Sequence, residues 1–162
     1  ADLAQRTLAA NVAIHRPLIL HEVIHGLGFS HSHFVAARDS AGKKKELLQL
    51  IPLTDTDGSK DEIWHFVKGR AYTSAQGYFN CHEKEKWWGL PLMGRPEIGR
   101  ASHWETRVLR DDVMSYGHQP IVSSITLAAL EDLGFYLANH SAAGCMRWGH
   151  LQGCSYVRSR CG

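Results

Sequence analysis

Two histidines and a glutamate lie within five residues of one another, in the order His21-Glu22-Val23-Ile24-His25. Positions i and i+4 of a helix share one face, so His21 and His25 can offer two imidazole nitrogens to one metal ion, with Glu22 beside them. Zinc suits imidazole, and a catalytic zinc site has three protein ligands and an open position for water. Glu22 can then act as general base and later as acid in peptide-bond hydrolysis. The pattern therefore predicts a peptidase with one catalytic zinc ion.

The residues around this motif predict the helix that presents it. Pro17 is well placed near a helix start, and Gly28 readily adopts the left-handed backbone conformation that ends many helices. The helix has an apolar body made of Leu18, Ile19, Leu20, Val23, Ile24 and Leu27. Residues 1–14 predict a further helix, which either precedes the Pro17 boundary or continues through it with a kink.

A catalytic zinc ion needs a third protein ligand, and two histidines compete for this position. His31 completes the pattern H-E-x-x-H-x-x-G-x-x-H, in which the glycine turn returns the chain to the metal. His103, in Ser102-His103-Trp104-Glu105, lies far along the chain. Spacing alone favours His31.

Several short motifs follow one another along the chain. They are His21 to Ser30, Phe79-Asn80-Cys81, Ser102 to Glu105, Asp112-Val113-Met114, Ile125 to Tyr136, and Trp148-Gly149 with Gly153-Cys154 and Cys161. Together they resemble the leishmanolysin-type zinc metalloproteases (peptidase family M8) of the metzincin clan. In that family a long insertion separates the motif's glycine from the third zinc-binding histidine, which matches His103. The resemblance therefore implies His21, His25 and His103 as ligands, with His31 as the alternative.

The same resemblance implies an α+β fold with a metzincin, or zincin-like, catalytic core. This core is expected to be largely helix and loop here, because the sequence that supplies the family's upstream sheet does not precede the motif. Met114 matches the Met-turn residue, which packs beneath the zinc site. Tyr116 resembles the tyrosine of astacins and serralysins, whose hydroxyl approaches the zinc and stabilises the oxyanion; the other interpretation is that its ring only packs beside the turn. Cys81 and Cys154 match a family disulfide.

The chain is interpreted as one domain with two parts. Residues 1–134 are the expected zinc-binding catalytic core, with a long insertion at about 31–101, and residues 135–162 are a cysteine-containing tail that docks by disulfides more than by regular structure.

Turn and cap residues predict the elements inside these parts. Turns are expected at residues 38–42 and 55–58, and the apolar segments Leu47 to Leu53 and Ile63 to Val67 predict a hairpin. Residues 87–101, rich in Trp, Gly and Pro, predict an ordered loop rather than a strand or helix. Further on, a helix is expected to begin after a cap at Ser123 or Ser124, to run through Leu133, and to stop at Gly134.

Composition narrows the class of protein. The chain has 162 residues and 44% hydrophobic content, enough for a real core. No apolar run approaches membrane-spanning length, so no transmembrane segment is predicted. The net charge of +2 is mild, and Lys43-Lys44-Lys45 is typical of a solvated turn, so nucleic acid is not an expected partner. Four cysteines without C-x-x-C spacing, together with the glycosylation sequon Asn139-His140-Ser141, favour an oxidising, secretory setting.

These observations predict a zinc endopeptidase that acts on proteins or peptides and is secreted or at the cell surface. The resemblance adds cell adhesion or host interaction for some family members, and membrane attachment or secretion. The alternative is a catalytically inactive fragment, or a domain that keeps zinc as a structural or adhesive element. Intact Glu22 favours the enzyme, because a structural zinc site usually fills its fourth position with protein and needs no adjacent carboxylate.

Overall fold

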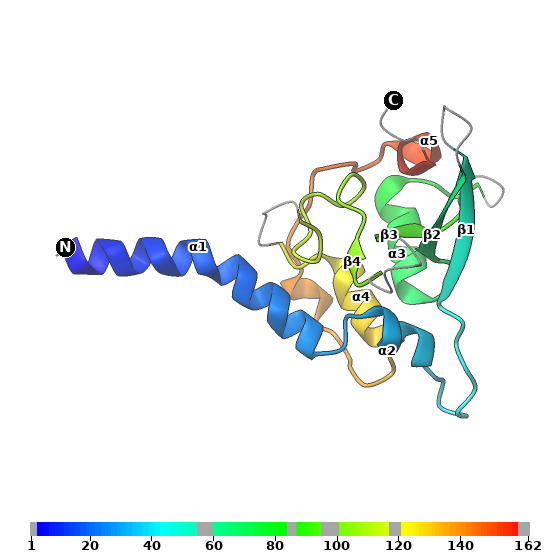
Figure 1. The fold of residues 1–162 in the computed structure, drawn as a ribbon, viewed down its shortest axis with the longest axis horizontal. Helices are drawn as coiled ribbons and strands as arrows, with labels where there is room; N and C mark the ends of the chain where they lie inside the picture. Colours follow the sequence, from blue (N-terminus) through cyan, green and yellow to red (C-terminus); the bar gives the residue numbers. More distant parts are fainter. Residues whose placement is uncertain (1–2, 55–59, 84–86, 95–100, 117–120, 159–162) are drawn as a thin grey trace.

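The computed structural model describes residues 3–54, 60–83, 87–94, 101–116 and 121–158. Its elements in chain order are α1 (Leu3–Gly26), α2 (His31–Ala36), β1 (Leu48–Thr54), β2 (Lys60–Phe66), α3 (Gly69–Phe79), β3 (Leu90–Met93), β4 (His103–Trp104), α4 (Ser124–Asp132), the 3-10 helix η2 (His140–Ala142) and α5 (Gly153–Arg158). Helices and a small antiparallel sheet are mixed, as the α+β class requires. Figure 1 shows a globular body from which α1 projects, with the N-terminus at its far end.

Helix α1 runs without interruption from Leu3 to Gly26 and contains Pro17. Pro17 is therefore not a helix start, and the alternative of one helix continuing through it is the correct one. A proline inside a helix removes one backbone hydrogen bond. The sequence before Pro17 is rich in alanine, and Leu18 and Leu20 follow it; both residue types have a high helix propensity that favours continuation.

The apolar body expected for this helix is mostly exposed. Ile24 is buried, at 3% exposure, whereas Leu18, Ile19 and Val23 are each more than half exposed, at 58%, 62% and 52%. The reason is that α1 projects from the globular body, so that only its C-terminal turns reach the core (Figure 1).

The predicted hairpin is present as strands β1 and β2. They pair antiparallel, with Leu48 opposite Phe66 and Ile51 opposite Ile63. The turn expected at 55–58 lies outside the described residues. The turn expected at 38–42 is confirmed, because the Asp39 carboxylate accepts hydrogen bonds from two backbone N–H groups that follow it.

The prediction of a loop for residues 87–101 is wrong at residues 90–93, and residues 95–100 lie outside the described residues. Leu90–Met93 forms β3, which pairs antiparallel with β2 and with β4 in a four-stranded sheet of order β1-β2-β3-β4. A four-residue stretch that contains Pro91 has little strand signal of its own, and its neighbours on either side supply the hydrogen-bond partners. The sheet is small, and most of the described residues lie in helices and loops, as expected.

Four fully buried aromatic residues form a closed ring of contacts at the centre of the body: Phe29, Phe34, Phe66 and Trp104. Each packs against two others, with ring centroids 4.8 to 5.5 Å apart. Aromatic pairs at this spacing each contribute about 0.5–1.5 kcal/mol beyond the burial of their surface. Phe29 follows the end of α1, and the other three residues come from α2, β2 and β4, so the four rings hold β4 against the end of α1.

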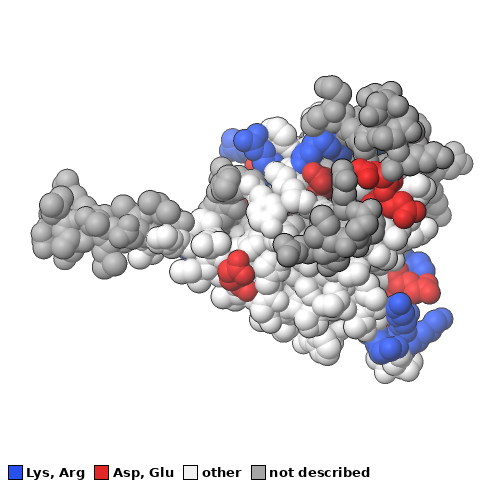
Figure 2. Space-filling view, viewed as in Figure 1, with Lys and Arg blue, Asp and Glu red and all other residues white. Residues whose placement is uncertain are grey.

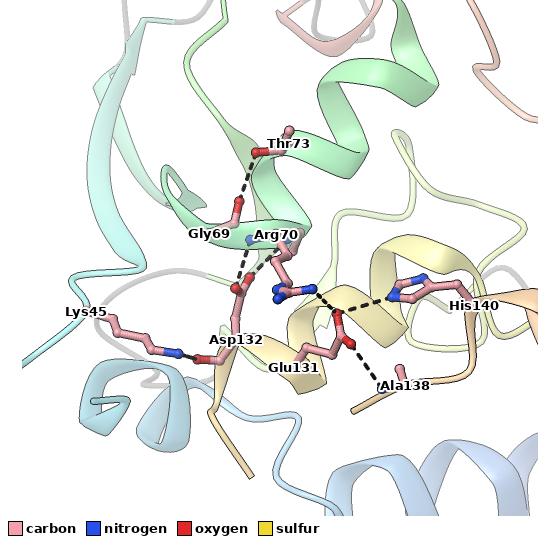
Figure 3. A network of polar contacts seen from close by, with 9 residues as sticks. Lys45, Gly69, Arg70, Thr73, Glu131, Asp132, Ala138 and His140 are labelled. Carbon is pink, nitrogen blue, oxygen red and sulfur yellow. Dashed lines mark hydrogen bonds and ion pairs between the residues drawn. The ribbon is translucent and has the colours of Figure 1, made fainter. Parts of the chain in front are cut away.

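Helix α3 is attached to α4 through the side chain of Asp132 (Figure 3). Its carboxylate accepts hydrogen bonds from the backbone N–H groups of Arg70 and Ala71, at 2.8 and 2.9 Å, and so caps the N-terminus of α3. Gly69 has a φ of +94°, and a Cβ there would lie 2.5 Å from the carboxylate, so this position requires glycine. Lys45 donates to the main-chain oxygen of Asp132 at 2.7 Å.

Helix α4 forms as the cap residues predict. Ser123 is the N-cap, and its hydroxyl accepts a hydrogen bond from the Thr126 N–H. Gly134 follows the helix with a φ of +89°.

The tail combines a disulfide with short regular elements. Cys81, just after α3, is bonded to Cys154 in α5, which confirms the pairing that the family resemblance implied. The tail also contains η2 and α5, so regular structure contributes more to its docking than expected. Among the described residues no helix combines the length and hydrophobicity needed to cross a membrane. On the face drawn in Figure 2, the charged side chains of the described residues lie in several small groups of both signs.

Candidate metal centre

Three histidine side chains from distant parts of the chain meet near the C-terminal end of α1. His21 and His25 lie one turn apart on α1, and His103 is the first residue of β4. The Nε2 atoms of His21 and His25 are 3.0 Å apart, and the Nε2 atom of His103 lies 3.1 Å from each of them. Within the described ranges, these are the three side chains whose ligand atoms lie close enough together that they could hold one metal ion.

Backbone carbonyl groups orient two of these rings. The Nδ1 atom of His21 lies 2.6 Å from the Val113 carbonyl oxygen, and the Nδ1 atom of His25 lies 2.7 Å from the Phe29 carbonyl oxygen. A carbonyl oxygen only accepts, so each Nδ1 carries the hydrogen. In the neutral ring the lone pair is then on Nε2, which is the atom that faces the other histidines.

The donor set fits a zinc ion. Burial, followed by the neighbouring His25 and His21, lowers the pKa of His103 from 6.5 to about 4, so this ring is neutral at neutral pH. Imidazole nitrogens in such close approach repel one another unless a proton or a metal cation lies between them. Zinc bonds imidazole nitrogen at about 2.0–2.1 Å, which in tetrahedral geometry separates ligand nitrogens by about 3.3 Å, close to the spacing in this cluster.

The end of helix α1 explains the position of the His25 ring. The Gly28 N–H donates to the His25 carbonyl at 2.9 Å, and the Phe29 N–H donates to the Ile24 carbonyl at 3.1 Å, the two bonds of a Schellman motif. Gly28 has a φ of +107°, and a Cβ there would lie 2.9 Å from Leu133 Cδ1. The same turn places the Phe29 carbonyl one helical turn beyond His25, where it accepts the Nδ1 hydrogen.

The segment that contains Met114 holds the other side of the cluster. The Val113 carbonyl orients His21, and the Met114 carbonyl accepts a hydrogen bond of 2.9 Å from the N–H of Trp104, the residue after His103. The Met114 side chain is fully buried. One short turn therefore connects α1 and β4 at the point where their histidines meet.

The buried carboxylate of Asp112 organises this turn, and sequence analysis did not assign it a role. It accepts hydrogen bonds from the N–H of Met114 at 2.7 Å, from the N–H and hydroxyl of Ser123, and from the hydroxyl of Thr126. Thr126 in turn accepts a hydrogen bond of 2.8 Å from the Trp104 indole N–H. Burial raises the pKa of Asp112, and these hydrogen bonds oppose the rise. The sequence contains little sign of this role, because Ser123 and Thr126, the helix-capping partners of Asp112, lie eleven or more positions away. The only local sign was an aspartate two residues before Met114.

Tyr116 lies against the third histidine. Its ring centroid is 4.4 Å from that of His103, and its hydroxyl oxygen is 3.4 Å from His103 Nδ1, on the side of the ring away from the cluster. The Tyr116 side chain is 54% exposed, so the hydroxyl is also accessible to solvent and to ligands.

His31 and Glu22 lie outside the cluster of three nitrogens. The His31 ring packs against Trp64, with centroids 4.8 Å apart, and its backbone N–H donates to Ser102 Oγ at 3.2 Å. His31 is therefore part of the support for the chain next to His103, because Ser102 precedes that residue. Glu22 is exposed and adjacent to His21 on α1.

Comparison with known proteins places the chain in a family. The model of the leishmanolysin family matches residues 5–162. The leishmanolysin-like peptidase of Drosophila melanogaster is 31% identical over 173 aligned residues, which cover 88% of this chain and 25% of that protein. The leishmanolysin homolog of Crithidia fasciculata is 30% identical, covering 88% of this chain and 20% of that protein, and the leishmanolysin of Leishmania tropica is 28% identical, covering 89% and 20%.

The chain thus spans a quarter or less of the length of these relatives. The match runs over nearly all of its residues, including the two helical histidines and the segment around His103. The chain belongs to the leishmanolysin family of peptidases, family M8.

Proposed function

We propose that this chain is the catalytic core of a zinc-dependent endopeptidase with a metzincin-type active site. The observation that carries the proposal is the convergence of three histidine Nε2 atoms within 3.0 to 3.1 Å of one another, two of them presented by an H-E-x-x-H helix. Membership in a peptidase family supports hydrolysis of peptide bonds in proteins as the reaction. In this proposal His21, His25 and His103 hold one zinc ion.

Each side chain of the site has a defined task in this mechanism. Zinc, when bound, supplies the Lewis acidity that polarises the scissile carbonyl and activates water. Glu22 takes a proton from the attacking water and later delivers it to the leaving nitrogen. The Val113 and Phe29 carbonyls keep the His21 and His25 rings in the tautomer that points Nε2 at the metal.

Two residues of the 112–116 turn act around the third ligand. Met114 packs beneath the site and, through its carbonyl bond to Trp104, keeps β4 in register with the turn. Tyr116 has two candidate roles, which are hydrogen bonding to a developing oxyanion and positioning of the His103 ring through Nδ1.

The extent and location of the unit are part of the same proposal. Residues 1–134 form the core, with the insertion at about 31–101, and residues 135–162 form a tail within the same domain. The Cys81–Cys154 bond supports a single domain, because it joins the insertion to the tail. The disulfide also supports a secreted or cell-surface location, since such bonds persist in oxidising compartments.

The decisive experiment compares Glu22→Ala with wild type in the full-length protein. We expect Glu22→Ala to retain zinc and to lose nearly all cleavage of an unstructured protein substrate, because the base is removed while the ligands remain. Glu62→Ala, at an exposed position on β2, is the matched control and should leave both zinc content and turnover unchanged.

The result also separates the enzyme from a zinc-stabilised binding domain. If the wild-type protein binds zinc but shows no cleavage of the protein substrate, and a chelator makes no difference, the result would support a zinc-stabilised binding domain. A Glu22→Ala variant with wild-type turnover would refute the assigned mechanism.

A further inference from the structure

The sequence contains one Asn-x-Ser/Thr sequon, Asn139-His140-Ser141, which the proposed peptidase function does not use. Its other two asparagines, Asn11 and Asn80, are followed two positions later by alanine and histidine. Such a sequon is the acceptor for N-linked oligosaccharide only on an accessible surface segment of a secreted chain. The conformation of these three residues therefore decides whether the motif can be used.

The sequon is exposed and forms a compact turn. Asn139 is the N-cap of η2, and all three residues of the sequon are exposed. The Asn139 Oδ1 atom accepts hydrogen bonds from the Ser141 hydroxyl at 2.7 Å and from the Ser141 N–H at 3.2 Å. Both bonds use the amide oxygen, so the amide nitrogen Nδ2, which is the atom that would be glycosylated, takes no part in them.

The residues on both sides of Asn139 are held to helix α4, Ala138 by its backbone and His140 by its side chain. Glu131 accepts a hydrogen bond from the Ala138 N–H at 3.0 Å, and its other oxygen lies 3.2 Å from His140 Nε2. Figure 3 shows the His140 ring directed toward Glu131. Ala138 and the His140 side chain therefore face the protein. The Asn139 and Ser141 side chains are hydrogen-bonded to each other on the exposed turn.

The position of the sequon keeps it apart from the turn that supports the metal centre. Asp112 binds Ser123 at the start of α4, whereas Glu131 lies near the end of this helix. With a rise of 1.5 Å per residue, Ser123 and Glu131 are about 12 Å apart along the helix axis. A substituent on Asn139 therefore leaves the hydrogen bonds of the Asp112 turn intact.

We propose that Asn139 carries an N-linked oligosaccharide. In the transfer, Nδ2 of Asn139 forms a bond to the anomeric carbon of an oligosaccharide carried on a lipid pyrophosphate. The bond from that carbon to the pyrophosphate oxygen breaks, one Nδ2 proton is released, and the lipid pyrophosphate leaves, with no change in oxidation state. The proposal rests on the extracellular location proposed above, for which the Cys81–Cys154 disulfide is a separate readout.

The experiment uses the full-length protein secreted from a eukaryotic host and measures occupancy at Asn139 by mass spectrometry after enzymatic release of N-glycans. We expect most wild-type chains to be glycosylated at Asn139. Asn139→Gln and Ser141→Ala should abolish the modification, and Ser141→Thr, which restores a hydroxyl two residues after the asparagine, should retain it. All variants should keep the disulfide and the peptidase activity of wild type.

The disulfide distinguishes the two ways in which the proposal can fail. Wild-type protein with Cys81 and Cys154 bonded but Asn139 unmodified would overturn the glycosylation site and leave the extracellular location standing. Wild-type protein with both thiols reduced and Asn139 unmodified would overturn the location and the glycosylation site together. Occupancy that survives in Ser141→Ala would also overturn the assignment, because the modification would then not depend on the sequon.

Discussion

Replacing Asp112 by alanine tests whether a buried carboxylate holds the metal centre together. Two of its donors are the backbone N–H groups of Met114 and Ser123, which cannot turn to another acceptor as hydroxyl groups can. An unsatisfied buried donor costs about 1–3 kcal/mol, so two of them cost about 2–6 kcal/mol of unfolding free energy. Removal of a buried charge offsets part of this loss, and we expect a net loss of about 2–4 kcal/mol.

The same substitution should weaken zinc binding. The Val113 carbonyl orients His21, and the Met114 carbonyl fixes the strand that carries His103, so a disordered 112–116 turn loses both constraints. Loss of such supporting contacts typically reduces metal affinity by about 10–100-fold. The assay is a urea unfolding series on the zinc-free full-length protein, followed by zinc titration of the folded protein.

Asp39→Ala is the matched control for this experiment. The Asp39 carboxylate also accepts two backbone hydrogen bonds, from the N–H groups of Ala41 and Lys43, both at 2.9 Å. Asp39 is exposed, so water replaces the lost acceptor and a change of about 0.5 kcal/mol or less is expected. Equal unfolding midpoints for the two variants, or unchanged zinc affinity in Asp112→Ala, would refute the reasoning.

Three further predictions concern His103, its rival His31 and the neighbouring Tyr116. His103→Ala should strongly lower zinc occupancy, whereas His31→Ala should barely change it; the reverse result in metal analysis would return the third ligand to His31. Tyr116→Phe should lower kcat about a hundredfold or more, with zinc content and KM little changed, if the hydroxyl stabilises the oxyanion. Weaker zinc binding in Tyr116→Phe with a smaller loss of kcat would identify a positioning role through His103, and unchanged values of both would leave Tyr116 as packing. The lowered pKa of His103 means that the fold disfavours its protonated form, so in the zinc-free protein its contribution to stability is present above pH 6.5 and is lost as pH falls toward about 4. Urea midpoints between those pH values should fall less steeply in His103→Gln than in wild type, and parallel curves would contradict this.

Local patterns were sufficient for features whose interactions lie within one helix or one hairpin. The i, i+4 spacing predicted that His21 and His25 share a helix face, because this follows from helix geometry alone. Gly28 predicted the end of α1, and the Ser123 cap with Gly134 predicted both ends of α4. In each case the hydrogen-bond partners lie within a few residues of one another, so the sequence pattern and the structure describe the same contacts.

Contacts between distant segments decided the rest of the candidate site. His21 and His103 are 82 positions apart, and their approach depends on the four buried aromatic residues and on the turn that contains Met114. Spacing favoured His31, and the family resemblance was needed to predict His103; the role of each as a ligand stays a prediction. Strand β3, the exposed face of α1 and the role of Asp112 had no local signal. The physical reason is that burial and hydrogen-bond pairing are properties of the neighbour that packs alongside, and periodicity within a segment carries no information about which neighbour that is.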